Sequence, residues 1–160
     1  MSNTLVNCVM LPVSHGHVLI PNTAVASMIS FTQPAPLPDS PAWLLGMINW
    51  QGWYLPVVSW SGIIDPQADV ALDNVRIAII KNLHKHGGMP YFAIIAKGFP
   101  RLLSITADDL ANGEEISLDD DGSGNSDCLL ARVQLENRSV DVPALPALGA
   151  YISRHLQRGD

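Results

Sequence analysis

The chain has 160 residues, which suits one compact domain and is too short for two ordinary independent domains. Its formal net charge of -6 argues against nucleic-acid binding, because phosphate contacts require a basic face. Hydrophobic residues make up 48% of the chain, but no apolar stretch approaches the ~18 residues of a membrane-spanning helix, so we expect no direct membrane insertion.

The start of the chain and its two cysteines predict a compartment. No secretory signal is recognisable before Leu5, so we expect a cytoplasmic protein. Cys8 and Cys128 are then expected to be reduced, buried thiols. A single disulfide between them is the alternative, and it would need an oxidising compartment.

The first part of the chain predicts a hairpin and a connector. Residues 5–12 and 17–20 are β-type runs on either side of a tight turn at 14–16. Asn22 or Thr23 is expected to cap a short helical turn over residues 24–28. Four prolines then exclude a regular element, because each lacks an amide donor, and they predict an extended connector: Pro34, Pro36, Pro38 and Pro41.

All four tryptophans fall in one short stretch, at positions 43, 50, 53 and 60. Residues 49–52 are a turn signal within it, and residues 53–60 read as a strand that Pro56 places at an edge or a bulge. Because Trp buries a large apolar area, we expect Trp43 and at least one of Trp50 and Trp53 to hold this corner. Any tryptophan left exposed is expected to mark a partner surface.

The second half of the chain predicts further strand pairs. Residues 75–80 and 91–96 are β-branched or aromatic runs that bracket a glycine-containing turn. Residues 127–135 and 139–142 suggest a final pair with a turn at 136–138, and residues 145–156 a short terminal helix. Many short strands at close spacing are typical of small β-barrels or a sandwich, so we expect an all-β fold with short helical turns.

Two His-x-His pairs are candidate metal ligands, because this spacing puts both rings on one side of a strand. Both pairs lie at expected hairpin ends, where polar side chains gather in any case, and no cysteine or carboxylate set completes either site. They nevertheless leave open an alternative function, a small-ligand- or metal-binding β-barrel module. The four residues are His15, His17, His84 and His86.

Other signals of ligand or catalytic chemistry fail. Residues 119–125 are acidic and glycine-rich, but Leu130 stands where an EF-hand needs its bidentate Glu, so we read them as an acidic loop. Thr106 to Asp109 read as a capping-box variant that starts a helical turn. Neither a nucleophile elbow nor a glycine-rich phosphate loop is present. We therefore expect no catalytic residues, no cofactor and no enzyme activity.

One segment carries a family resemblance. Its residues are Pro41, Leu44-Leu45, Gly46-Met47-Ile48-Asn49, Gly52, Pro56 and Val57-Val58. They resemble the stretch of the CheW family of chemotaxis coupling proteins that reads Gly-Val-Ile-Asn-Leu-Arg-Gly and then Pro-Val-Val-Asp-Leu. The resemblance extends to residues 75–80 and 91–96, where the family has two central strands, and more loosely to 97–99 and 102–106.

The resemblance implies a single domain over residues 1–160, built from two interlocked five-stranded SH3-like barrels. Subdomain ranges of roughly 13–70, and 3–12 with 73–152, are expected. It also implies a non-enzymatic adaptor that joins the regulatory domain of a CheA-type histidine kinase to the cytoplasmic tips of methyl-accepting chemoreceptors. Open barrel edges leave homo-oligomerisation as a further expectation.

Departures from the family pattern refine this reading. Gln51 stands where the family usually has Arg, Ser27 where it can have the Glu that pairs with that Arg, and Ser59 where it usually has Asp. Such a corner resembles the ChpC-type adaptors of type IV pilus and twitching-motility systems. The partner surface implied by the family comprises Val25, Ser27, Met28, Trp50, Gln51, Trp53 and Pro56.

Overall fold

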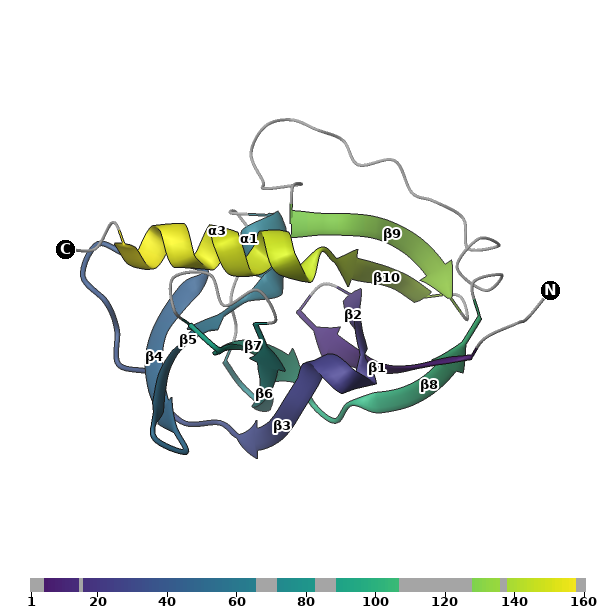
Figure 1. The fold of residues 1–160 in the computed structure, drawn as a ribbon, viewed down its shortest axis with the longest axis horizontal. Helices are drawn as coiled ribbons and strands as arrows, with labels where there is room; N and C mark the ends of the chain where they lie inside the picture. Colours follow the sequence, from purple (N-terminus) through teal and green to yellow (C-terminus); the bar gives the residue numbers. More distant parts are fainter. Residues whose placement is uncertain are drawn as a thin grey trace.

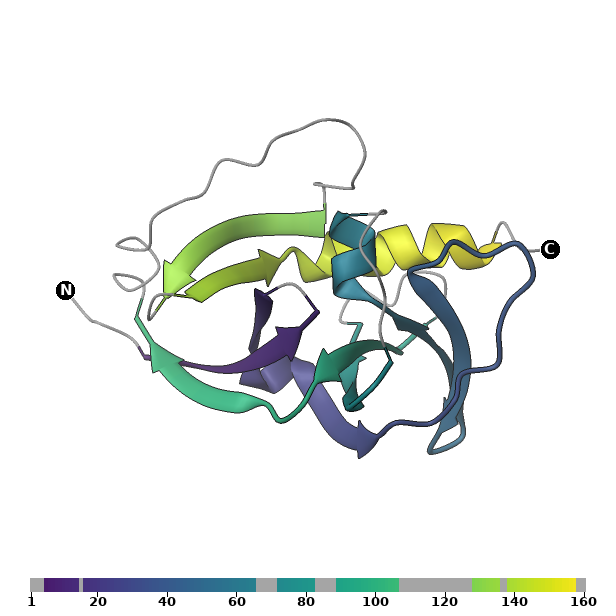
Figure 2. The ribbon, with the colours of Figure 1, turned by 180° about the vertical axis from the view of Figure 1, so that it is seen from behind.

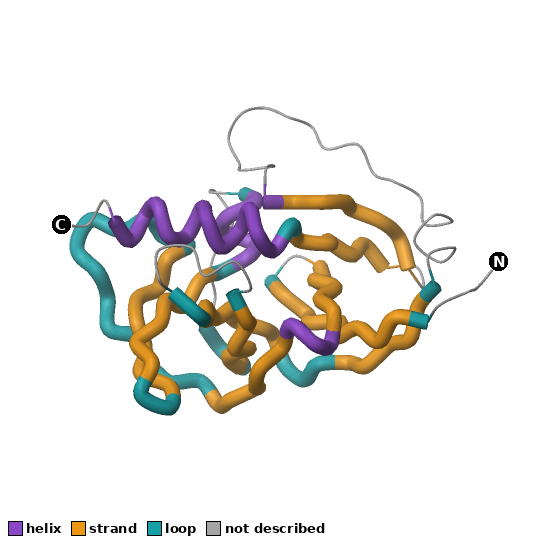
Figure 3. Tube along the Cα trace, viewed as in Figure 1, coloured by secondary structure: helices purple, strands orange, loops and turns teal. Residues whose placement is uncertain are grey.

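The computed structural model describes residues 5–14, 16–65, 72–82, 89–106, 128–135 and 138–157. Strands make up most of this part of the chain (Figure 3). They form two five-stranded sheets that lie next to each other (Figure 1). The predicted all-β architecture of two five-stranded units is confirmed.

The terminal sheet takes its strands from both ends of the chain: β1 (Val6–Val13), β2 (Gly16–Pro21), β8 (Arg101–Ile105), β9 (Leu129–Leu135) and β10 (Arg138–Pro143). Their order is β8-β1-β2-β10-β9, with every ladder antiparallel except β2 with β10. The predicted first hairpin is confirmed by the β1–β2 ladder, and the predicted final pair by the β9–β10 ladder.

The central sheet is continuous in sequence: β3 (Val25–Ser30), β4 (Leu44–Trp50), β5 (Trp53–Val58), β6 (Val75–Lys81) and β7 (Tyr91–Lys97). Its order is β3-β6-β7-β5-β4, with one parallel ladder between β5 and β7. The predicted pairing of residues 75–80 with 91–96 is confirmed by the β6–β7 ladder. Because the chain leaves the terminal sheet after β2 and returns to it at β8, the two units are interlocked.

The sheets group the strands differently from the expected subdomain ranges. Those ranges separated β1 from β2, and β6 and β7 from β3 to β5. In the structure, the tight turn after Val13 makes β1 and β2 antiparallel neighbours in one sheet. Likewise β3 pairs with β6, and β5 pairs with β7, so residues 25–97 supply all of the central sheet.

In the described part of the chain, three helical segments accompany the sheets: the 3-10 turn η1 (Asn22–Ala24), α1 (Trp60–Ile64) and α3 (Leu145–Gln157). The predicted terminal helix is confirmed as α3, which runs from β10 across to the β4 side of the molecule in both Figure 1 and Figure 2. Its buried side chains Leu148 and Ile152 are four residues apart and therefore share one face of the helix.

Two local expectations were wrong. The helical turn expected over residues 24–28 is the end of η1 followed by β3, because the backbone there pairs with β6. Pro21, and neither Asn22 nor Thr23, occupies the cap of η1, and no side chain caps it. The strand expected to reach Trp60 ends at Val58, because Ser59 caps α1 by accepting a hydrogen bond from the amide of Gly62 at 3.2 Å.

Several strands are apolar on both faces, and the structure shows why. In β6, Ile77 and Ile79 lie in a cluster enclosed by the central sheet, whereas Ala78 and Ile80 lie in a core shared with the terminal sheet. In β1, Cys8 and Met10 likewise face a separate cluster of the terminal sheet, while Val9 and Leu11 face the shared core. Each strand therefore buries its two alternating faces in two different cores.

The cysteines agree with the expectation of buried thiols. Cys8 and Cys128 are both buried, and neither forms a disulfide. Burial raises the pKa of the Cys8 thiol. Within the described ranges no helix is long and apolar enough to cross a membrane. The expected acidic loop, the turn started by Thr106, and His15, His84 and His86 lie wholly or largely outside the described residues.

Candidate partner-binding site

The turn between β4 and β5 determines how the middle tryptophans are presented. Gln51 and Gly52 have φ values of 50° and 84°, and Trp50 pairs with Trp53 across the turn. Two positive φ values in a two-residue loop are typical of a type I′ turn, whose twist matches that of the flanking strands. The Asn49 Oδ1 accepts a hydrogen bond from the Gly52 amide at 3.3 Å, which supports the turn.

An aromatic corner, which we define as Trp50, Trp53, Tyr54 and Tyr91, forms around this turn. The Trp50 and Tyr91 rings meet edge to face at 5.1 Å, and the Trp53 and Tyr91 rings at 6.1 Å. Trp50 is half-buried, whereas Trp53 is 48% exposed and Tyr54 is 62% exposed. The corner thus combines a ring anchored in the central sheet with two large rings open to solvent.

Trp43 does not hold this corner, contrary to the expectation. It is buried beneath α3, where its ring stacks on Tyr151 at 5.2 Å and meets His155 edge to face at 4.9 Å. The part of the expectation that concerned Trp50 and Trp53 is confirmed by their contacts with Tyr91. Trp43 instead packs against the end of the helix, because it lies just before β4 begins, at the opposite end of that strand from the turn.

The remaining residues of the implied partner surface are divided between edge strand β3 and the interior. Val25, Ser27 and Met28 lie in β3 and are half-buried, with Val25 and Met28 packed partly on the shared core. Pro56 is buried in β5 and presents no surface. In the central sheet, three strands separate β3 from β4. Val25, Ser27 and Met28 of β3 therefore share no ladder with Trp50 of β4.

The positions that carry a charge pair in the family are neutral and unlinked here. Gln51 is exposed in the turn, and Ser27 pairs in register with Ile79 of β6. Among the described residues, neither side chain has a hydrogen-bond partner. The corner is held by ring contacts and by the neutral bond between Asn49 and Gly52.

A polar triad that the sequence did not predict links α1 to the terminal sheet; Trp60 and Asp141 are buried, and Arg132 is half-buried. The Trp60 Nε1 donates to the Asp141 Oδ2 at 2.8 Å, and the Arg132 Nε donates to the Asp141 Oδ1 at 2.6 Å. The hydrogen bond to Asp141, and then its charge, raise the pKa of the Arg132 guanidinium. The only sequence signal was that a buried Trp needs an acceptor for its indole N–H, which does not identify Asp141.

A further exposed aromatic residue lies just beyond the other end of β7. Phe99 is 73% exposed, and the guanidinium of Arg76 lies 4.1 Å from the centre of its ring. Next to it, the Lys97 ammonium binds a carboxylate oxygen of Asp73 at 3.1 Å, and the hydrogen bond from Lys97 lowers the pKa of Asp73.

The described part of the chain gives no support to the metal-site alternative. Within it, no three His, Cys, Asp or Glu side chains lie close enough together to hold a metal ion. His17 lies in β2, where burial and then the charge of Arg138 lower its pKa.

The chain is similar to known proteins in both sequence pattern and structure. Residues 7–138 match the model of the family described as CheW-like domain. A solved structure of the scaffolding protein TtCheW from Thermoanaerobacter tengcongensis is similar, with a TM-score of 0.67 and 11% identity over 88% of this chain and 89% of that chain. No curated protein matches the chain.

These comparisons agree with the two interlocked five-stranded sheets. The predicted fold of two SH3-like barrels is confirmed. Since the family match covers well over half of the sequence, the chain belongs to the CheW-like domain family.

Proposed function

We propose that this chain is a non-enzymatic adaptor that links a CheA-type histidine kinase to methyl-accepting chemoreceptors. The observation that carries this proposal is the match to the CheW-like domain family over residues 7–138. The similar scaffolding protein TtCheW supports a scaffolding role. Because the receptor tips lie in the cytoplasm, the adaptor would act there.

The aromatic corner is the surface that we propose for one of these partners, the regulatory domain of the kinase. Trp and Tyr are the residue types most enriched among energetically important interface residues, and Trp53 and Tyr54 are left open to solvent. Gln51 lies between the two tryptophans and would contact the same partner. Pro56 would support this surface from within β5.

Edge strand β3 is the surface that we propose for the receptor tip. Val25, Ser27 and Met28 retain partial exposure there, at the opposite edge of the central sheet from β4. Two separate surfaces are what a linking protein requires. The neutral Ser27 and Gln51 favour a pathway of the type IV pilus and twitching-motility class over flagellar chemotaxis.

Direct binding measurements test this function. Purified chain would be titrated with the regulatory domains of the CheA-like kinases of its own host, and with fragments of the receptor tips. Trp53→Ala should weaken kinase binding at least about tenfold, as expected of a central aromatic interface residue. Phe99→Ala is the matched control, because Phe99 is also an exposed aromatic residue and lies beyond the opposite end of β7.

Two outcomes would count against the proposal. If no host kinase domain and no receptor fragment binds the wild-type chain, the adaptor role is wrong. If binding survives Trp53→Ala and is lost in Phe99→Ala, the role stands but the kinase surface lies elsewhere. Comparing pilus-associated with flagellar partners decides the pathway.

A further inference from the structure

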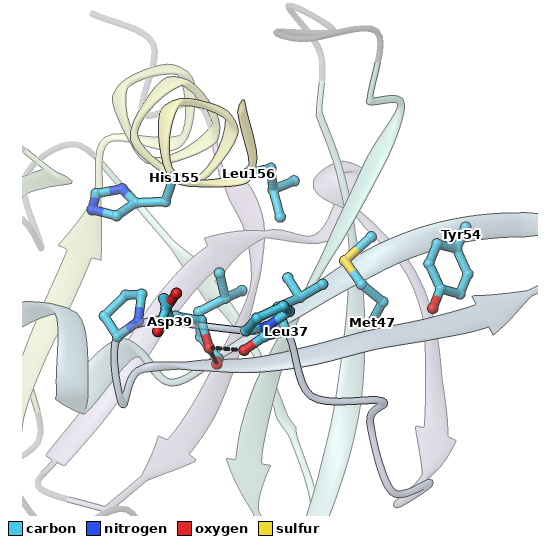
Figure 4. A pocket seen from close by; sticks show the side chains of 10 residues that line it. Leu37, Asp39, Met47, Tyr54, His155 and Leu156 are labelled. Atoms are coloured by element: carbon cyan, nitrogen blue, oxygen red, sulfur yellow. Dashed lines mark hydrogen bonds between the residues drawn. The ribbon is translucent and has the colours of Figure 1, made fainter. Parts of the chain in front are cut away.

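A groove lies between the connector after β3 and the end of α3, and it is separate from the ring contacts of the aromatic corner. We call it the connector groove; its volume is about 570 Å³. In Figure 4, His155 and Leu156 of α3 form one wall, Leu37 and Asp39 of the connector the opposite one, and Met47 and Tyr54 lie along the sheet. The remaining lining residues are Pro38, Ser40, Pro41 and Leu44.

The groove is a fixed feature, because its connector wall is tied to β4. The amide of Ala35 donates to the Met47 carbonyl at 2.8 Å, and the amide of Met47 donates to the Ala35 carbonyl at 2.9 Å. The hydroxyl of Ser40 donates to the carbonyl of Leu37 at 3.0 Å, which closes the turn below Asp39. On the opposite side, Trp43 stacks beneath α3 and fixes the helix end.

Among the described residues, Asp39 supplies the unpaired carboxylate of this groove, and the Tyr54 hydroxyl, which also lines it, can donate or accept a hydrogen bond. Asp39 is exposed, and within the described ranges its carboxylate has no hydrogen bond or ion pair. His155 Nδ1 lies 3.0 Å from the Tyr151 carbonyl oxygen. Because that oxygen can only accept, Nδ1 is the donor in this contact. The hydroxyl hydrogen of Ser40 is already used in the hydrogen bond to the Leu37 carbonyl.

The rest of the lining is apolar. Leu44 is buried at the base, while Met47 and Leu156 are half-buried and Leu37 and two prolines complete the walls. An apolar base with a few convergent polar groups is typical of a binding site. Here the group without a partner among the described residues is the Asp39 carboxylate, so the complementary occupant carries a positively charged donor next to an apolar side chain.

We propose that the connector groove binds a segment of a partner protein that presents an Arg or Lys side chain beside a Leu, Ile or Met. The cation pairs with the Asp39 carboxylate, and the apolar side chain rests on Leu44 and Met47. The net charge of -6 attracts such a segment over a distance and opposes a second copy of this chain. The groove shares Tyr54 with the aromatic corner, but its other lining residues are separate from that corner, and the test below assumes none of the adaptor's partners.

A displayed library of random 12-residue peptides tests the proposal without assuming any partner. The library would be selected on the wild-type chain and counter-selected on Met47→Lys, which places a like charge at the base of the groove. The expected result is a consensus with Arg or Lys within one helical turn of an apolar residue. An acidic consensus, or no enrichment over the counter-selection, would overturn the proposal.

One selected peptide then tests the role of Asp39 by isothermal titration. Asp39→Asn removes the charge but keeps a residue that tolerates the φ of 57° at this position. It should weaken binding about two- to fivefold, as expected for a solvent-exposed ion pair, and the effect should shrink at high salt. Asp73→Asn makes the same change in net charge away from the groove and should leave binding unchanged.

Three further outcomes would overturn the proposal. Equal losses in Asp39→Asn and Asp73→Asn would show only a long-range effect of charge. A sedimentation experiment in which the free chain dimerises, and Met47→Lys separates the dimer, would assign the groove to a second copy. Binding of the Arg→Glu version of the peptide with unchanged affinity would exclude a cation site. Thermal unfolding of each variant confirms that it remains folded.

Discussion

The indole Nε1 of Trp60 donates a 2.8 Å hydrogen bond to the Asp141 carboxylate, although 81 positions separate the two residues in the sequence. Trp60 begins α1, directly after β5 of the central sheet, and Asp141 lies in β10 of the terminal sheet. Both side chains are buried, and Arg132 of β9 neutralises the carboxylate. This bond is therefore a polar link between the two barrels within an otherwise apolar shared core.

Removing either member of this link should destabilise the protein. Trp60→Phe should lower the free energy of unfolding by about 1.5–3 kcal/mol, the usual value for a hydrogen bond to a charged group. Asp141→Asn should cost about 3 kcal/mol, because it leaves the Arg132 charge without its partner. Urea unfolding monitored by circular dichroism measures both changes.

The exposed pair of Lys97 and Asp73 provides the control for the buried one. Asp73→Asn should leave the urea midpoint almost unchanged, because solvent screens a surface pair. A Trp60→Phe variant as stable as the wild type would show that the indole hydrogen bond contributes no net stability.

Gly46 is expected to tolerate no side chain. Its φ is 141°, and a Cβ atom there would overlap the carbonyl oxygen of Ala35, which belongs to the bridge that holds the connector on β4. Gly46→Ala should therefore cost about 3 kcal/mol or more, from overpacking together with backbone strain. The measurement is the free energy of unfolding in urea.

A substitution at Gly52 distinguishes overpacking from backbone strain as the cause of the loss at Gly46. It also has a positive φ, but a Cβ atom added there would meet nothing within 4 Å. Gly52→Ala should cost only about 1 kcal/mol, from strain alone. Equal losses in the two variants would show that the contact with Ala35 is not what constrains Gly46.

The turn of the aromatic corner can be improved at position 51. Gln51 adopts a φ of 50°, which Asn accepts more readily, and Asn-Gly is the preferred pair in type I′ turns. Gln51→Asn should raise the free energy of unfolding by about 0.5–1 kcal/mol. Differential scanning calorimetry would detect the rise in Tm.

Gln51→Arg restores the charge found in the family. Its effect on stability should differ from that of Gln51→Asn. Because Ser27 offers no carboxylate, the new cation gains no partner there and should fail to stabilise the fold. A clear gain in Tm for Gln51→Arg would contradict the idea that the corner depends only on ring packing and neutral hydrogen bonds.

His17 should make the fold sensitive to acid. Burial and the charge of Arg138 lower its pKa in the folded state, so the unfolded chain binds the proton more tightly. Stability from this group is therefore complete above the unfolded pKa of about 6.5 and is lost as the pH falls below it. His17→Gln should reduce the drop in unfolding free energy between pH 7.5 and pH 5.5, measured in urea. An unchanged drop would assign the pH dependence to other groups.

Much of the fold followed from local patterns in the sequence. Strong β-type runs predicted the β1–β2, β6–β7 and β9–β10 pairs, because β-branched residues next to turn signals favour hairpins. The end of β5 was missed because Val58 and Trp60 look equally suited to a strand, and only the capping bond of Ser59 starts α1 there. At the site, the sequence found Trp50 and Trp53 but not Tyr91, which lies far away in the chain.

Local patterns in the sequence were enough to predict three hairpin pairs, the turn at residues 49–52 and the resemblance to the CheW-like family, since all of these depend on neighbouring residues or on a continuous motif. Which tryptophans are buried, in contrast, depends on packing between distant segments. Trp43 and Trp60 lie against α3 and Asp141, respectively, whereas Trp53 remains open to solvent. The four have the same chemistry, and what distinguishes them is packing against segments some 40 to 110 positions away in the chain, which no local pattern records.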